Sequence, residues 1–234
     1  MTKKFFVESS GFGILLSTLI VWQTMAHQST RGNEANEVIR LPEPKYDGKV
    51  SVEASLRKRR SVREYLADPL TLTEVSQLLW AAQGITGQEG KRTAPSAGAL
   101  YPLEVYVVAA RVQNLLPGVY KYLPRTHELS KVADGDLRGS LSTAALDQDC
   151  VKEAAIDIVL AAVYERTTKK YGQRGIKYVH MEAGHAAQNV FLQAVALNLG
   201  AAVVGAFQDD QVKRVIGLSK EEQPLYIMPV GRPR

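Results

Sequence analysis

The sequence predicts a single domain that combines β-strands with α-helices. Two continuous apolar runs rich in β-branched residues, Val105–Ala109 and Ile156–Val163, are typical of buried strands. Two shorter runs, Val119–Tyr122 and Leu129–Val132, bracket a Pro-Arg-Thr-His turn and predict a hairpin. A long apolar segment over Ile176–Leu199 predicts a helix. A chain of 234 residues has room for one well-packed domain of this kind.

Capping signals add two helices ahead of the first strand. A helix over residues 51–58 opens on Ser-Val-Glu, and a second begins at Thr71 and ends at Gly84. The last strands are expected over Ala201–Gly205 and Leu225–Val230.

The long helix is apolar on nearly every side. Phe191, Leu192 and Val195 lie opposite its main apolar face. That face consists of Ala183, Ala187, Val190, Ala194 and Leu197. A helix of this kind must be covered on nearly all sides, which one small subunit cannot easily do. The pattern therefore predicts a homodimer.

The bulk composition excludes two classes of function. The net charge is +5, but the basic residues do not form a stripe interleaved with aromatic residues, so we expect no nucleic-acid partner. A mildly basic surface also suits a protein that holds a phosphate-bearing cofactor. The single cysteine, Cys150, allows no internal disulfide and no thiolate metal cluster. We expect it to be a small, partly buried apolar residue.

Residues 1–26 have the pattern of a secretory signal peptide. Two lysines precede the uncharged run Phe12–Trp22, and Thr-Met-Ala supplies a small-x-small ending. An uncleaved membrane anchor is the alternative, although a spanning helix needs about 20 apolar residues. Residues 27–50 are expected to form a flexible linker and extended arm, and residues 51–234 the domain. The protein is therefore predicted to be exported to the periplasm or cell envelope, and to contact the membrane only if the segment is uncleaved.

A basic run over residues 57–63 is the first candidate binding element. Arg59, Ser61 and Arg63 alternate, so their side chains share one side of an extended segment. Guanidinium groups and a hydroxyl that converge in this way can clamp a phosphate. A solvated charged face is the alternative interpretation.

A loop of small residues over 93–102 is the second element. It carries no charge between Thr93 and Leu103, and two prolines stiffen it. Small side chains let the backbone approach a flat ligand closely. A tight surface turn ahead of a strand is the alternative.

The segment from His180 to His185 superficially resembles a metal-binding motif. Zinc versions place two histidines four residues apart, whereas these two are five apart and about 140° around a helix from each other. We therefore expect no metal. Glu182 lies three residues before His185 and can hydrogen-bond to it along the helix, which favours a buried, satisfied histidine.

Six stretches in this order resemble the SagB-type dehydrogenases of the FMN-dependent nitroreductase family, over residues 51–232. The matching stretches are RRSVR (59–63), PSAGALYP (95–102), KYGQRG (170–175), EAGHAAQN (182–189), VGAF (204–207) and PVGRP (229–233). The resemblance implies an α+β fold with a mixed, mainly antiparallel sheet flanked by helices. It also implies a homodimer with FMN at the subunit interface.

The resemblance also implies a set of cofactor-binding residues. The FMN phosphate and ribityl chain would be held by Arg59, Arg60, Ser61 and Arg63. The flavin ring would lie along Pro95, Ser96, Ala97 and Gly98, and its polar edge would meet the backbone of Val203, Val204, Gly205 and Ala206. Many relatives place further basic residues on a C-terminal extension. Here only Arg232 or Arg234 could substitute for them.

The azoline-oxidising relatives use a Lys-Tyr pair in catalysis. Two such pairs occur here, Lys170-Tyr171 and Lys177-Tyr178, and the first lies in the better-matching context. Lys170 and Tyr171 are therefore the candidate catalytic residues, with a helix-surface role as the alternative.

These observations predict an FMN-dependent oxidoreductase. It would move two electrons between a donor, with NAD(P)H as one candidate, and a small organic acceptor or a modified peptide. The first alternative is a non-catalytic flavin-binding or electron-relay module at the cell envelope. The second is an interaction domain that has lost the flavin, and the intact 59–63 run argues against it.

Overall fold

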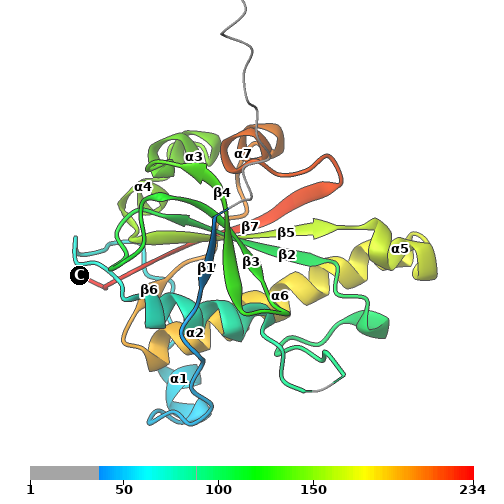
Figure 1. Cartoon of the computed structure of the whole chain (residues 1–234), viewed down its shortest axis with the longest axis horizontal. Helices are drawn as coiled ribbons and strands as arrows, with labels where there is room; N and C mark the ends of the chain where they lie inside the picture. The colour runs from blue at the N-terminus through cyan, green and yellow to red at the C-terminus, as the bar shows by residue number, and fades with distance from the viewer. Residues whose placement is uncertain (1–36, 88) are drawn as a thin grey trace, which may run out of the picture. The chain divides into compact units, whose positions relative to one another are not determined.

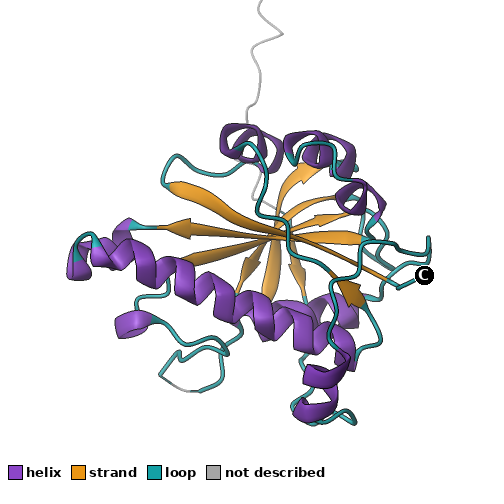
Figure 2. Ribbon diagram, turned by 180° about the vertical axis from the view of Figure 1, so that it is seen from behind, coloured by secondary structure: helices purple, strands orange, loops and turns teal. Residues whose placement is uncertain are grey.

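A seven-stranded sheet forms the middle layer of the protein, in the order β1-β4-β3-β2-β5-β7-β6 (Figures 1 and 2). The computed structural model describes residues 37–87 and 89–234. The strands are β1 Val38–Arg40, β2 Leu103–Ala109, β3 Gly118–Leu123, β4 Glu128–Asp134, β5 Ile156–Val163, β6 Gly200–Ala201 and β7 Glu222–Gly231. Neighbouring strands pair antiparallel, and one isolated parallel bridge, between Ser61 and Ala201, adds to the β6 edge.

The two apolar runs form the centre of the sheet, as predicted. β2 and β5 pair over seven residues, from Leu103 opposite Ala162 to Ala109 opposite Ile156. Both strands are buried along nearly their whole length because helices cover both faces. The predicted hairpin is confirmed as β3 and β4, joined by a turn in which His127 adopts a left-handed φ of 54°.

One face of the sheet carries α1 (Val52–Lys58), α2 (Leu72–Gln83) and α6 (Arg174–Ala196), and the other carries α3 (Arg138–Ala144), α4 (Asp149–Glu153) and α7 (Asp209–Ile216) (Figure 1). α5 (Glu165–Tyr171) follows β5 at one end of the sheet, and a short 3-10 helix, η1 (Ala97–Ala99), precedes β2. Within the described residues, no helix combines the length and apolarity that crossing a membrane requires.

The helix starts follow the capping signals. Thr71 and Glu74 form a complete capping box at the start of α2, and Gly84 ends that helix. Ser51 accepts a hydrogen bond from the Ala54 amide at the start of α1. These local patterns work because they satisfy backbone N–H groups that the first helical turn leaves unpaired.

The structure corrects three sequence-based boundaries. The expected strand 201–205 is reduced to β6, because only Gly200 and Ala201 pair continuously with β7. The long helix ends at Ala196, since Asn198 adopts a left-handed φ of 57°. The folded unit also begins before residue 51, because β1 pairs with β4 and Leu41 is buried. Residues 1–26 and 27–36, with the predicted signal and linker, lie outside the described residues.

Asp157, on β5, is an unusual core residue. Its side chain is fully buried, and neither carboxylate oxygen has a hydrogen-bond partner within residues 37–87 and 89–234. Burial raises the pKa of Asp157 well above its ordinary value, Arg138 partly opposes this, and Asp136 adds to it. The folded protein therefore holds a proton that the unfolded chain releases above about pH 4.

Stability should consequently fall as the pH rises above that value, because the raised pKa belongs to the folded state alone. Asp157→Asn should flatten this part of the pH profile. A difference of 1 kcal/mol corresponds to about 2–4 °C in Tm for a domain of this size. Thermal unfolding between about pH 5 and about pH 8 measures the effect, with the exposed Asp68→Asn as control. If Tm changed with pH in the same way in the parent, Asp157→Asn and Asp68→Asn, the raised pKa of Asp157 in the folded protein would be contradicted.

Candidate functional site

The basic segment Arg59–Arg63 lies along the β6 edge of the sheet. Ser61 bridges Ala201 in parallel, and the Val62 amide donates to the Ala201 carbonyl at 2.8 Å. Val62 fits only because residue 200 is glycine, since a Cβ there would lie 2.6 Å from the valine side chain. The backbone of the segment is thus fixed to the sheet, while the side chains of Ser61 and Arg63 are exposed.

The three arginines of this segment differ in their surroundings. Arg59 lies over the ring of Phe191 on α6, 5.2 Å from its centroid. Arg60 turns back and donates to the carbonyls of Arg57 and Arg59 at 3.1 and 2.8 Å. Arg63 is exposed. None of the three forms an ion pair in the described part of the chain, so their charges are available to an anion.

Arg63 also affects the pKa of a cysteine in the core beneath residues 59–63. Burial raises the pKa of the Cys150 thiol, the nearby Asp157 adds to this, and Arg63 opposes it. Cys150 is a buried free cysteine, as the sequence predicts.

Arg232 lies at the same edge, but its guanidinium is occupied. It bonds both oxygens of Glu74 in α2, at 2.7 and 2.9 Å. Burial opposes ionisation of Glu74, but the hydrogen bonds from Arg232 and Thr71 outweigh it and lower the pKa of that carboxyl. The Arg232 carbonyl accepts from Leu66 at 2.9 Å, which places the C-terminal strand beside the basic segment. A phosphate role for Arg232 would require it to release Glu74.

The small-residue loop has an unusual backbone. Gly98, Ala99 and Tyr101 all adopt left-handed φ values, of 65°, 54° and 46°. The Ser96 hydroxyl accepts a hydrogen bond from the Tyr101 amide at 2.9 Å and closes the loop on itself. Pro95 and Gly98 are exposed, and Ala97 is half-buried. Side chains no larger than a methyl group at residues 97–99 leave room for a flat ligand.

The structure places Lys170 and Tyr171 directly against this loop. A Cβ on Gly98 would lie 2.8 Å from the Tyr171 hydroxyl and 3.1 Å from Lys170 Nζ. Lys170 Nζ is 5.4 Å from the centroid of the Tyr171 ring. In the second Lys-Tyr pair, Tyr178 packs edge-on against Tyr171 at 5.2 Å and Lys177 is exposed. The structure therefore joins the first predicted pair to the predicted ring-binding loop.

Residues 203–206 leave the sheet after β6 with partly free backbone. Val204 exchanges two backbone hydrogen bonds with Ile227, at 2.8 and 3.0 Å. Gly205 and Ala206 are exposed, and within the described residues their amides donate to no acceptor. The Ala206 carbonyl accepts from Gln148 at 3.1 Å. Two adjacent free N–H groups suit the polar edge of a ligand.

The expected buried pairing of Glu182 with His185 is wrong. His185 is exposed, because it projects from the side of α6 that faces away from the sheet, and it makes no hydrogen bond to Glu182. Glu182 is buried instead. Burial raises the pKa of Glu182 to about 7, and the Ser96 hydroxyl and Arg92 oppose the shift. No cluster of three metal-binding side chains occurs in the part of the chain that the structure describes.

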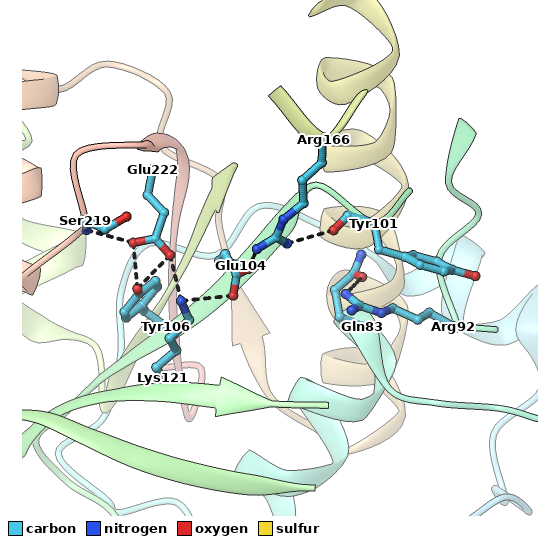
Figure 3. A network of polar contacts seen from close by, with 9 residues as sticks. All are labelled: Gln83, Arg92, Tyr101, Glu104, Tyr106, Lys121, Arg166, Ser219 and Glu222. Carbon is cyan, nitrogen blue, oxygen red and sulfur yellow. Dashed lines mark hydrogen bonds and ion pairs between the residues drawn. The ribbon is translucent and has the colours of Figure 1, made fainter. Parts of the chain in front are cut away.

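Sequence reasoning missed a network of charged residues beside the loop (Figure 3). Glu104 on β2 contacts Arg166 at 2.5 Å and Lys121 at 3.1 Å, and Lys121 contacts the buried Glu222 at 2.7 Å. Burial disfavours the charge on Lys121, but Glu222 and Glu104 outweigh it and raise its pKa. Glu104 and Lys121 lie on strands that are neighbours in the sequence, whereas the other two pairs are 62 and 101 residues apart. The one local signal was a charged Glu104 within a strand run.

A cavity of about 610 Å³ opens between residues 45–50, α1, α2 and α6. None of the predicted site residues lines it. The candidate site is instead an open arrangement of surface elements in the single subunit.

Comparisons with known proteins identify relatives over most of the chain. The sequence pattern of the Nitroreductase family matches residues 56–232. A Methanocaldococcus jannaschii protein named as a nitroreductase is 49% identical over 183 residues, which are 78% of this chain and 91% of that protein. The microcin B17-processing protein McbC of Escherichia coli is 30% identical over 147 residues, 60% of this chain and 54% of McbC, so the chain spans about half of that relative.

Solved structures share the fold. A crystal structure from Anabaena variabilis, described as that of a nitroreductase, superposes with a TM-score of 0.76 at 33% identity over 85% of this chain and 42% of the other. The NADPH:FMN oxidoreductase of Vibrio harveyi, solved with NAD⁺, has a TM-score of 0.57 over 78% of this chain and 68% of its own. At 20% identity, the second likeness shows the fold alone.

The contact between Gly98 and the Lys170-Tyr171 pair can be tested with matched glycines. Gly98→Ala and Gly90→Ala both place alanine at a left-handed φ, which costs about 1–2 kcal/mol. Only the methyl group at position 98 meets the ends of Lys170 and Tyr171, because nothing lies within 4 Å of a Cβ at position 90. The ring NMR signals of Tyr171, assigned by their loss in Tyr171→Phe, should shift in Gly98→Ala alone. Equal spectra for the two alanine variants would disprove the contact.

Proposed function

This chain belongs to the nitroreductase family of oxidoreductases, as its six sequence stretches predict, and from that premise we propose that it is an FMN-dependent enzyme. It moves two electrons between a donor such as NAD(P)H and a small organic acceptor or a modified peptide. The observation that carries the proposal is the contact of Lys170 and Tyr171 with the small-residue loop. A catalytic pair and a ring-binding surface then form one site.

The residues present fit FMN. Arg59 and Arg63 have no acidic partner in residues 37–87 and 89–234, and Ser61 is exposed between them, so this clamp suits a phosphate and ribityl chain. Arg60 belongs to the same segment, but its side chain first has to leave two carbonyls. The ring-binding surface is formed by Pro95, Ser96, Ala97 and Gly98, and the free amides of Gly205 and Ala206, next to Val203 and Val204, suit a polar edge.

The clamp and the loop lie at opposite ends of the central strands. The loop enters β2 at Leu103, whereas the other end of β2, Ala109, pairs with Ile156, which in turn pairs with Val230 beside β6. Six residue steps at about 3.3 Å each separate the two ends by about 20 Å along the strand. We propose that one FMN is held by the clamp of one subunit and the loop of a second.

Exposed apolar side chains support the homodimer. Val52 and Leu56 on α1 are 63% and 53% exposed, and Met181 on α6 is 53% exposed. Large exposed apolar side chains on two neighbouring helices suit surfaces that a partner covers. A second copy of the chain supplies that cover and completes the site.

Bound FMN would supply the two-electron chemistry. The chain's own residues would bind it and handle protons. The Tyr171 hydroxyl and the Lys170 ammonium, both at Gly98, can hold or release a proton beside the reacting atoms. Since donor and acceptor would use the same open face, they should alternate there.

Two relatives favour different classes of acceptor. The likeness to the Escherichia coli microcin B17-processing protein favours a modified peptide, whereas the more similar Methanocaldococcus jannaschii protein, named as a nitroreductase, favours a small organic molecule. Export through residues 1–26 to the periplasm or cell envelope is part of the proposal, and it would place the reaction outside the cytoplasm. The alternative function is a flavin-binding electron-relay module, which would bind FMN and react with no acceptor.

Replacing both clamp arginines should weaken FMN binding. Each charge-assisted hydrogen bond contributes about 1.5–3 kcal/mol, and about 1.4 kcal/mol is one decade in affinity. Arg59→Ala/Arg63→Ala should therefore raise the Kd for FMN at least about tenfold in a fluorescence titration. Arg125→Ala/Arg214→Ala removes the same charge from exposed positions and should leave the Kd unchanged. Equal affinities for the two double variants would refute the phosphate clamp.

The Lys-Tyr pair is tested by its effect on rate. An acid or base catalyst typically contributes about 10²-fold or more, so Lys170→Ala and Tyr171→Phe should slow transfer to a quinone or nitroaromatic acceptor by about that factor. Lys177→Ala and Tyr178→Phe, which alter the neighbouring pair, should stay close to the parent rate. The measurement is stopped-flow reoxidation of dithionite-reduced enzyme. Rates within about twofold of the parent in the first two variants would remove both residues from the mechanism.

A further inference from the structure

Helix α5 meets the small-residue loop at two points, one helical turn apart. Lys170 and Tyr171, at its end, contact Gly98. Arg166, in its first turn, donates a hydrogen bond from Nη1 to the Tyr101 carbonyl at 3.1 Å. The loop is therefore held along the helix, and not at a single side chain.

Arg166 is itself anchored to the sheet. Its Nη2 contacts Glu104 at 2.5 Å, and the second oxygen of Glu104 contacts Lys121 at 3.1 Å. The Glu104 side chain is only 15% exposed, so its position is well defined. Figure 3 shows the guanidinium between Glu104 and Tyr101, where it links strand β2, helix α5 and the loop. A planar guanidinium can bond two acceptors at once in this way.

The residue that Arg166 holds is strained. Tyr101 adopts a φ of 46°, which is unfavourable for a bulky side chain. Three contacts keep it there: its amide bonds Ser96, its carbonyl bonds Arg166, and its ring lies under the Arg92 guanidinium, 4.5 Å from Arg92 Cζ. Strained backbone persists only where its surroundings fix it, and it concentrates at functional sites.

From this geometry we infer that Arg166 is a positioning residue of the site. By joining Tyr101 to Glu104, it fixes the loop 96–101 on α5 and so sets where Lys170 and Tyr171 lie relative to the bound ring. The inference rests on the proposed function, because it assigns a role toward the same cofactor and the same Lys-Tyr pair. The hydrogen bonds of Arg166 go to the Tyr101 carbonyl and to Glu104, which also compensates its charge.

The test uses three variants of the full chain. Arg166→Gln removes both the charge and the planar guanidinium. Arg166→Lys keeps the charge, but its single ammonium cannot bond both acceptors as the guanidinium does. Lys169→Gln is the matched control. Lys169 lies on the same helix and its ion pair with Glu165 is highly exposed on both sides, so its loss should change nothing. Each protein is measured for FMN affinity, for stopped-flow reoxidation, and for hydrogen exchange of the Ala99 and Tyr101 amides.

We expect Arg166→Gln to keep binding FMN with at most a modest loss of affinity, because the phosphate clamp of residues 59–63 is intact and only the loop beside the ring is loosened. Its reoxidation rate should fall by about tenfold, because small misplacements of catalytic groups have effects of that order or larger. The Tyr101 amide of Arg166→Gln should exchange faster than that of the parent. In reoxidation rate and in amide exchange, Arg166→Lys should fall between the parent and Arg166→Gln.

A parent-like rate, or a slow rate with unchanged amide exchange, would overturn the positioning role, and so would a loss of FMN binding in Arg166→Gln alone. Failure of the proposed function has a different signature, because the parent protein itself would then bind no FMN. In that case the exchange of the Tyr101 amide still decides whether Arg166 fixes the loop.

Discussion

Burial of both faces of the central strands is the constraint on which the rest of the structure depends. β2 and β5 pair over seven residues and are covered by helices on either side, so they have no free surface for a ligand. Residues with proposed chemistry therefore lie at strand ends and edges. The register places the start of β2 beside the end of β5, which brings the small-residue loop against α5. The same register places the basic clamp of residues 59–63 at the opposite end of these strands, beside β6. A proposed site that uses both elements therefore needs a second subunit.

Local signals in the sequence were sufficient for the elements they describe. The apolar runs of β2 and β5 and the start of α2 at Thr71 were predicted because each depends on residues only a few positions apart. The six motif stretches indicated the family for a similar reason, since each is a short pattern in a fixed order. The contact between Gly98 and the Lys170-Tyr171 pair gives two of these stretches a shared position that their order alone did not show.

Contacts between residues that are far apart in the sequence could not be predicted from local patterns. β1 pairs with β4 at the edge of the sheet, and no local pattern in residues 38–40 predicts this strand. Arg232 bonds Glu74, 158 residues away, and so ties the last strand to the start of α2. His185 was expected to be buried because it lies close to Glu182 in sequence, but of the two only Glu182 is buried in the subunit. The network around Glu104 was missed because its members come from four separate elements.

We propose that this chain holds FMN between two copies of itself. The most direct test of this proposal is the visible absorbance spectrum of the purified protein, reconstituted with FMN and separated by size exclusion with light-scattering detection. From the proposed function we expect flavin bands that elute with a dimer, at one FMN per chain, and that bleach on addition of dithionite. A protein that elutes free of flavin after reconstitution, or a flavin-loaded monomer, would contradict the account.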